Sequence, residues 1–417
     1  MPKKISIHYH TECSFFAGCE NMLANFFNSD DFRQSHDVTF SYVQSESYNQ
    51  GLKRRVNKEL PIYPINFLDL SNCNMLPEWL PLIIRKIFTA ALRLLFSFPL
   101  FIYQVFILFR LFKKLNPDIL HINNGGYPAA RSALAAAIAG KFAGIPKVLM
   151  VVNNIARDYR HYSRWLDLPI DRLVVRSVNI FITGSKAAGV KLRDVLNLPE
   201  HQVIAINNGI NMRSLSNSVG STRHRLGVGD FEGVVFGIVA LLIPRKGHQV
   251  LLEAILKLVT DKKLEYCQFK ILIEGSGPLQ QTLFDFVELN NLASWITFVG
   301  EEDHIIDFMA ALDVLILPSV QDEDFPNVIL EAMALGKPVV ASLLAGTPEQ
   351  VVEGITGLLV EPRNIDQLAD AVFQLTNNSK IRNSMGRAGL SRFNSCYTSQ
   401  IALNNYSNLY RALIEGI

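Results

Sequence analysis

Short apolar runs that alternate with longer amphipathic segments are the feature that most constrains how this chain can fold. Runs of this length, separated by segments with helical periodicity, are typical of parallel sheets built from βαβ units. The sequence therefore predicts an α/β protein with parallel sheets. The predicted strands are 4–9, 37–43, 118–123, 147–152, 178–183 and 203–206 in the first half, and 233–241, 269–274, 295–299, 313–317, 338–341 and 357–360 in the second.

Length and one polar segment divide these elements into two sets. A chain of 417 residues is too long for one ordinary domain and suits two. The segment from Asn211 to Asp230 is rich in Ser, Asn and Gly and has no apolar periodicity. We therefore predict a first domain over residues 1–212 and a second domain over residues 213–396.

The composition excludes several classes of protein. Apolar residues make up 49% of the chain and charged residues 19%, which permits a large core and argues against disorder. A net charge of +2 is too balanced for a general nucleic-acid-binding protein. We therefore expect a globular protein with no nucleic-acid partner.

The cysteines and the N-terminal segment favour a reducing compartment. The cysteines are scattered, odd in number and without a C-x-x-C pair, which argues against a disulfide framework and against a zinc site. The N-terminal segment lacks the continuous apolar run of a signal peptide, so we expect a cytoplasmic location. The cysteines are Cys13, Cys19, Cys73, Cys267 and Cys396.

Residues 79–116 differ from the rest because every charge among them is positive. The uncharged stretch between Arg93 and Arg110 is shorter than the ~20 residues that cross a bilayer, and Pro99 interrupts it. Two interpretations stay open. One is a buried helix pair with basic ends. The other is a surface that enters an anionic leaflet on the inner face of the cell membrane, which the lack of any acidic residue favours.

Residues 313–342 form the most informative segment of the chain. A buried strand over 313–317 leads through a loop into a helix, where Pro326 suits the first turn because its missing N–H would be unpaired there. Gly336 ends the helix before the next strand. Such a crossover brings the start of the helix to the carboxyl edge of the sheet, where ligands of open α/β sheets bind.

The loop and the helix of this segment offer groups that suit a sugar nucleotide. The N–H groups of Phe325, Asn327 and Val328, together with the helix dipole, would favour a diphosphate. Glu323 in the loop and Glu331 on the helix can accept hydrogen bonds from hydroxyls, one at a donor sugar and one at a ribose. Two glutamates at this spacing alone are more simply a coincidence on a solvated face, so the interpretation depends on the whole segment.

The whole segment resembles the E-x(7)-E signature of the retaining, nucleotide-sugar-dependent glycosyltransferases of family four (group one). Typical members have EGFPNVLLEAMA followed by G-x-PVVA, and this chain has EDFPNVILEAMA followed by GKPVVA. The departure is Asp324, which adds a negative charge where a glycine is usual. The resemblance implies the GT-B fold, with two Rossmann-like domains that face a central cleft. It implies donor binding by Glu323, Asp324, Phe325, Pro326, Asn327, Val328 and Glu331.

The resemblance continues through the second half of the chain. The segment FGIVALLIPRKG resembles the strand and loop that open the family's second domain, and this implies that Lys246 reaches the donor diphosphate. An exposed basic turn would explain this segment equally well if it stood alone. Leu241 stands where the family usually has an arginine, and Arg245 is the candidate substitute. The segments ILIEGSG and FVG add Gly275 and Val299, the latter at the border of the nucleotide base.

The first half resembles the family more loosely. Gly18 is the one glycine left of a Gly-rich turn that approaches the donor phosphates and the acceptor, and Asn124 ends the acceptor-side strand. Asn153 stands where many members have a histidine that contacts the donor sugar; its amide can still bind a hydroxyl but carries no charge. The helix over 397–417 resembles the family's last helix, which packs back on the first domain.

The resemblance implies a function. We expect a hexosyl- or N-acetylhexosaminyl-type transferase that moves a sugar from a nucleotide diphosphate to a glycan or lipid-linked acceptor with retention. Glu323, Lys246, Arg245 and Asn153 are the predicted catalytic set, in which the two cations stabilise the leaving diphosphate. Because no D-x-D motif is evident, we expect no metal and no other cofactor. Bacterial surface-polysaccharide synthesis is our hypothesis for its role.

Two alternatives stay open at this point. A nucleotide-sugar epimerase or a sugar phosphorylase could use the same fold, because function resides in the site and not in the fold. A non-catalytic partner could also have kept the fold. Leu241 and Asn153, which replace the usual arginine and histidine, are the reason to consider it.

Overall fold

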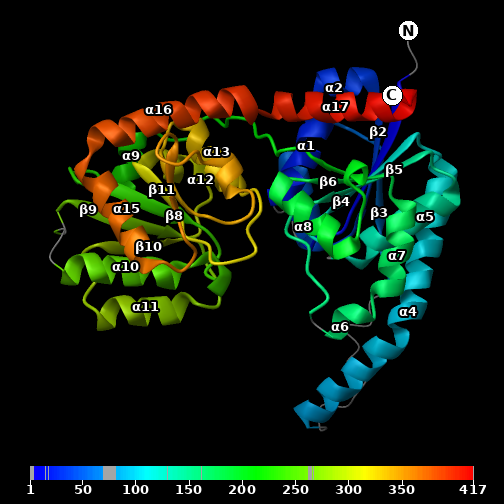
Figure 1. Cartoon of the computed structure of the whole chain (residues 1–417), viewed down its shortest axis with the longest axis horizontal. Helices are drawn as coiled ribbons and strands as arrows, with labels where there is room; N and C mark the ends of the chain where they lie inside the picture. The colour runs from blue at the N-terminus through cyan, green and yellow to red at the C-terminus, as the bar shows by residue number, and fades with distance from the viewer. Residues whose placement is uncertain are drawn as a thin grey trace. The chain divides into compact units, whose positions relative to one another are not determined.

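The computed structural model describes residues 4–14, 16, 18–68, 81–128, 130–160, 162–261, 265 and 267–416. Cys73 and residues 79 and 80 of the basic segment lie outside the described residues. The chain divides into two compact units (Figure 1). The first comprises Met1–Ile206 with Leu403–Ile417, and the second comprises Asn207–Ala402. The division falls before Asn207, whereas the sequence places it between residues 212 and 213.

The first unit contains a parallel sheet in the order β3-β2-β1-β4-β5-β6-β7. All of its strands except β3 were predicted. The missed strand has only four residues, one of which is Pro64, and it lies at the edge of the sheet, where a residue without an N–H is tolerated. The strands are β1 (Ile5–Thr11), β2 (His36–Val43), β3 (Ile62–Ile65), β4 (Ile119–Asn124), β5 (Lys147–Val152), β6 (Ile180–Thr183) and β7 (Val203–Ala205).

Helices surround this sheet and bury its apolar side chains. Several begin at a serine whose hydroxyl accepts a hydrogen bond from a backbone N–H in the first turn, such as Ser45 and Ser185. The helices and 3-10 turns are η1 (Gly18–Glu20), α1 (Asn21–Asn28), α2 (Asp30–Ser35), α3 (Glu46–Arg55), α4 (Leu82–Leu115), α5 (Arg131–Ala143), α6 (Tyr162–Trp165), α7 (Leu168–Ser177), α8 (Lys186–Leu196) and η2 (Glu200–Gln202).

The second unit contains a parallel sheet in the order β10-β9-β8-β11-β12-β13, and all of its strands were predicted. Figure 1 shows α10 and α11 on one face of this sheet and α12 and α13 on the other. The strands are β8 (Val234–Val239), β9 (Phe269–Glu274), β10 (Ile296–Gly300), β11 (Val314–Leu317), β12 (Val339–Ser342) and β13 (Gly357–Val360). The helices and turns are α9 (Val219–Arg225), η3 (Pro244–Lys246), α10 (His248–Thr260), α11 (Gln280–Leu289), α12 (Ile305–Ala311), α13 (Asn327–Ala334), α14 (Thr347–Gln350), α15 (Ile365–Asn377) and α16 (Ser379–Cys396).

Both sheets confirm the predicted doubly wound α/β architecture. In each, strand order reverses beside the first strand of the unit, so β1 neighbours β4 and β8 neighbours β11. Open parallel sheets bind ligands at the carboxyl edge of such a switch point. The last helix, α17 (Ser399–Glu415), ends in the first unit, where the Tyr410 hydroxyl hydrogen-bonds with His121 Nδ1 at 2.6 Å.

Candidate functional site

The switch point of the second unit brings together the loops that follow β8 and β11. Gly247, between η3 and α10, has φ +73°, and a Cβ there would lie 1.8 Å from the carbonyl oxygen of Pro318. The Val320 N–H also donates to the Arg245 carbonyl at 2.8 Å. A side chain at position 247 would separate these loops, so the glycine is required for their close approach.

Three of the predicted catalytic residues meet in these loops. Lys246 Nζ lies 2.5 Å from Glu323 Oε2, and Arg245 Nη1 lies 3.6 Å from the same oxygen. The Ser319 hydroxyl donates to that oxygen at 2.8 Å, and the Glu323 residue is only 8% exposed. The carboxylate is thus held by two cations and a hydroxyl at the carboxyl edge of the sheet.

The helix that follows Glu323 begins where the sequence predicts. Pro326 caps α13, whose first N–H groups have no partner within the helix itself. Phe325 is buried and packs against Tyr397 with ring centres 5.7 Å apart, and Asp324 is 3% exposed. The Phe325 side chain is therefore part of the core. A negative charge on Asp324 would suit the positive end of the helix dipole but would oppose a bound phosphate.

Glu331 and Asn327 on α13 each have a neighbour that the sequence did not indicate as a site residue. Arg213 Nη2 is 3.9 Å from Glu331 Oε1, and the Asn208 amide donates to Asn327 Oδ1 at 3.5 Å. Both neighbours lie near the predicted domain boundary and outside the predicted strands and helices, so no periodic pattern indicated them. Glu331 therefore has a cation beside it, and its side chain is 13% exposed.

Gly275 follows β9 and is a second position where only a glycine fits. Its φ is +127°, and a Cβ would lie 2.2 Å from the Ala240 carbonyl oxygen. Leu241, where the family usually has an arginine, is 50% exposed next to this contact. Val299 in β10 is half-buried and packs against the core. Gly275 thus shapes the loop after β8, and it does so by close backbone packing.

Two buried titratable residues beside these loops were missed by sequence reasoning. Burial raises the pKa of Glu274 at the end of β9 to about 7, and the nearby charges of Glu301 and Glu302 add to the shift. Burial and the charge of Lys246 lower the pKa of His248 at the start of α10 to about 4. Among the described residues, neither ring nitrogen of His248 has a hydrogen-bond partner. Neither residue belongs to a recognisable sequence motif, so the sequence gave no indication that its pKa is shifted.

The carboxyl edge of the first unit contains a group of hydrogen-bonded amides. The Asn153 amide nitrogen, after β5, donates to Asn123 Oδ1 at 2.8 Å and to the Asn124 carbonyl oxygen at 3.0 Å. Asn124 is 1% exposed and its side chain bonds Pro128 and Ala130, so it anchors the loop after β4. Asn153 remains half-buried at the edge.

Gly18 lies in η1 at the same edge, and Glu20 in that turn is buried. The Glu20 carboxylate accepts hydrogen bonds from Thr11 at 3.0 Å, from the Asn123 amide at 3.1 Å and from the Tyr48 hydroxyl at 2.8 Å. The sequence did not single out Glu20, because one acidic residue in a short turn has no recognisable pattern.

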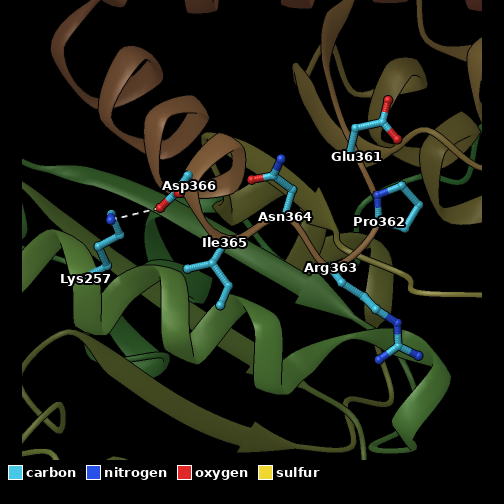
Figure 2. A pocket seen from close by; sticks show the side chains of 7 residues that line it. All are labelled: Lys257, Glu361, Pro362, Arg363, Asn364, Ile365 and Asp366. Atoms are coloured by element: carbon cyan, nitrogen blue, oxygen red, sulfur yellow. Dashed lines mark ion pairs between the residues drawn. The ribbon is translucent and has the colours of Figure 1, made fainter.

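A separate open hollow of about 610 Å³ lies at the start of α15 (Figure 2). Lys257 and Asp366 line it and form an ion pair of 2.9 Å between Nζ and Oδ1. It contains none of the predicted site residues. Among the residues that the structure describes, no cluster of three His, Cys, Asp or Glu side chains is placed to hold a metal ion.

Comparison with known proteins shows that the chain is similar to glycosyltransferases. The family model "Glycosyl transferases group 1" matches residues 233–378, and "Glycosyltransferase Family 4" matches residues 71–214. An uncharacterized glycosyltransferase of Methanocaldococcus jannaschii is 33% identical over 46% of this chain and 48% of its own length. N-acetyl-alpha-D-glucosaminyl L-malate synthase of Bacillus anthracis is 28% identical over 40% of this chain and 42% of its own length. The chain thus spans about half of the length of these curated relatives.

Other relatives match over nearly the whole chain. The UDP-Gal:alpha-D-GlcNAc-diphosphoundecaprenol alpha-1,3-galactosyltransferase of Escherichia coli is 23% identical over 84% of this chain and 90% of its own length. The structure of Anabaena HepE with UDP superposes with a TM-score of 0.77 at 18% identity, covering 98% of this chain and all of HepE. The chain therefore has the GT-B fold, and two glycosyltransferase family models match separate parts of it.

Proposed function

We propose that the protein is a retaining glycosyltransferase that uses a nucleoside-diphosphate sugar as donor. The observation that carries this proposal is the cluster of Lys246, Arg245 and Glu323 beside the start of α13. Two cations and a helix N-terminus at one sheet edge suit a diphosphate, and the carboxylate suits the hydroxyls of a sugar.

The proposed chemistry follows from these groups. The bond between the anomeric carbon and the β-phosphate oxygen breaks, and negative charge develops on the diphosphate. Lys246 and Arg245 stabilise this charge, and they transfer no proton. The acceptor oxygen attacks from the side that the phosphate leaves, and its proton passes to a phosphate oxygen. The anomeric configuration is retained.

The acceptor is a glycan or lipid-linked sugar, and the transferred group is a hexose or an N-acetylhexosamine. The names of the relatives support this choice: one acts on a GlcNAc-diphosphoundecaprenol, and HepE was captured with UDP. We place the protein on the cytoplasmic face of the membrane in bacterial surface-polysaccharide synthesis, and assign it no metal and no other cofactor.

A thermal-shift screen tests the proposal. Nucleoside diphosphates and their sugar conjugates are added to the native protein and to Glu331→Gln, with and without a divalent metal. A metal-independent rise in Tm with one nucleotide series, reduced in the variant, is expected because Glu331 binds the ribose. Incubation of that donor without acceptor separates transfer from epimerisation. The absence of any shift would support a non-catalytic partner, with Leu241 and Asn153 as the first positions to restore.

A further inference from the structure

Helix α4 presents a continuous apolar stripe to solvent. Leu95, Phe98, Ile102 and Phe106 are 69%, 59%, 54% and 53% exposed. Their spacing of three or four residues places them on one face of the helix. Single exposed apolar side chains are ordinary in soluble proteins, but a stripe of large ones marks an interaction surface.

Another face of α4 belongs to the core of the first unit. Phe101, Leu108 and Phe112 are 3%, 0% and 0% exposed and pack in the same cluster as Leu120 and Ile122 of β4. The segment Leu95–Leu115 is long and apolar enough to cross a bilayer, with a mean hydropathy of 1.9. A spanning helix would have to remove three side chains from the core, so the helix stays on the protein and only its outer face can meet lipid.

The charges around the stripe indicate which kind of membrane surface would bind it. The 34-residue helix contains no acidic residue. Arg110, Lys113 and Lys114 are exposed on its last turns, and the Arg110 guanidinium lies 5.8 Å from the centre of the Phe106 ring. Arg131 of α5 donates to the Ser97 carbonyl oxygen at 3.0 Å and adds a cation beside the stripe. Basic groups next to an apolar face suit an anionic membrane surface.

We propose that the outer face of α4 lies in the interface of an anionic membrane as a monotopic element. Leu95, Phe98, Ile102 and Phe106 enter the boundary between headgroups and acyl chains, and the basic end contacts the headgroups. The inference deepens the membrane contact of the proposed function and rests on it. Lipid binding requires neither donor nor catalysis, so the two can fail separately.

Vesicle sedimentation tests the inference with phosphatidylcholine vesicles and with vesicles that also contain phosphatidylglycerol. The native protein is expected to bind the anionic vesicles. The double variant Phe98→Ser with Phe106→Ser should bind at least tenfold more weakly, because two exposed rings no longer enter the interface. Lys113→Gln with Lys114→Gln should weaken binding to anionic vesicles alone, by about fivefold per charge. Phe373→Ser on α15, 39% exposed in the native protein, is the matched control and should bind as the native protein does.

Equal vesicle binding by the native protein and the Phe98 and Phe106 variant would overturn the inference. If the native protein is a dimer without lipid and the same substitutions make it a monomer, the exposed face of α4 binds a second copy of the chain instead. Retention on membranes after an alkaline carbonate wash would indicate a spanning helix. If the double variant melts early, Ile102→Ser replaces it. The thermal shift caused by the donor is measured on the native protein and on each variant. If the native protein binds vesicles but shows no donor shift, only the proposed function is contradicted.

A second, independent observation concerns which atom Asn153 offers to a ligand. The Asn123 amide nitrogen donates to Glu20 Oε1, and the Asn123 Oδ1 accepts from the Asn153 amide. The Asn124 carbonyl likewise requires the Asn153 nitrogen. Both donors of that amide have acceptors, and its Oδ1 is the atom left to face the site.

We infer that Glu20 is a positioning residue, which acts through Asn123 and fixes the atom that Asn153 offers to a substrate hydroxyl. This inference also rests on the proposed function. Glu20 is 1% exposed and far too enclosed to contact a ligand itself. Its role is to fix the orientation of the Asn123 amide, which in turn fixes the orientation of the Asn153 amide.

A double-mutant cycle on kcat/KM tests this role. Glu20→Leu, which removes the acceptor of Asn123, should lower kcat/KM about tenfold in the native background and have almost no effect in the Asn153→Ala background, since the residue acts through Asn153. Glu20→Gln, which can keep Oε1 as the acceptor of Asn123, is the conservative control and should lower kcat/KM much less. A purely structural role would give the same factor in both backgrounds, and would overturn the inference. Unchanged kcat/KM in Asn153→Ala would remove Asn153 from the site. An inactive native protein would instead contradict the proposed function.

Discussion

The carboxyl edges of the two sheets differ in charge although the sheets share the same strand order. In the second unit, Lys246 and Arg245 surround the Glu323 carboxylate. In the first unit, Asn123 and Asn153 form a chain of neutral amides. Preorganised cations suit a group whose charge changes during a reaction, whereas oriented amides suit hydroxyls that must be distinguished. The comparison suggests that one architecture provides electrostatic stabilisation in one unit and directional recognition in the other.

The first unit should lose more stability on acidification than the second. Burial lowers the pKa of His8, His10 and His121 in the first unit to about 3. Their stabilising contribution is complete above the unfolded pKa of 6.5 and is lost as pH falls. Acidification from pH 7 to pH 5 should therefore cost the first unit on the order of 2 kcal/mol per histidine. Amide hydrogen exchange in β1 and β4, corrected for intrinsic rates, measures this loss.

The second unit contains Glu274, whose pKa is raised by burial to about 7. Its contribution is complete below the unfolded pKa of 4.5 and is lost as pH rises through 7, at a cost on the order of 2 kcal/mol between pH 5 and pH 8. His248 opposes this trend because its pKa is lowered. Glu274→Gln should therefore gain stability over the native protein as pH rises. The same pH trend in exchange of β4 and β9 would contradict the comparison.

The loops that follow β8 and β11 in the second unit lie so close together that one added methyl group at position 247 should lower the stability of the protein. Gly247→Ala requires a left-handed residue and meets the Pro318 carbonyl, so we expect a loss of roughly 2–4 kcal/mol in the free energy of unfolding. Gly227→Ala is the matched control, because Gly227 has φ +71° and no atom within 4 Å of the added Cβ. Its expected loss is only about 1 kcal/mol. Denaturant unfolding of both variants checks this, and equal losses would show that the loop contact contributes little.

Removal of the lysine should separate charge stabilisation from folding. Lys246→Ala is expected to lower the rate of sugar transfer about 100-fold, because the leaving diphosphate loses a preorganised cation. Lys257→Ala in the same unit removes a lysine that pairs with Asp366 away from the site and should leave the rate unchanged. Single-turnover kinetics with a saturating donor distinguish the two. A rate unchanged by Lys246→Ala would leave the second unit without its proposed electrostatic role.

The smallest effect concerns the missing arginine. Leu241→Arg places a cation at an exposed position beside the loop, and exposed charges contribute under about 1 kcal/mol. We therefore expect donor KM to fall by no more than about fivefold, as titration of nucleoside diphosphate would show. No change would indicate that Arg245 already replaces the usual arginine.

Some of the site could be predicted from the sequence and some could not. The segment EDFPNVILEAMA predicted both the loop and the start of α13, because proline and the apolar pattern act locally. Arg213 beside Glu331 was missed, since its role depends on where a polar segment crosses the second unit. The strand β3 was missed because it has only four residues, one of which is a proline, and only Ile65 is buried.

Periodicity and turn residues in the sequence by themselves determined the alternating strands and helices of two parallel sheets, since strand and helix patterns and glycine or proline positions are local properties of the chain. Only the tertiary structure decided which charges meet and which faces are left uncovered. The ion pair of Lys246 with Glu323, the order of amides behind Asn153 and the outer stripe of α4 all depend on contacts between residues far apart in sequence. Such contacts are set by packing, which one-dimensional patterns do not specify.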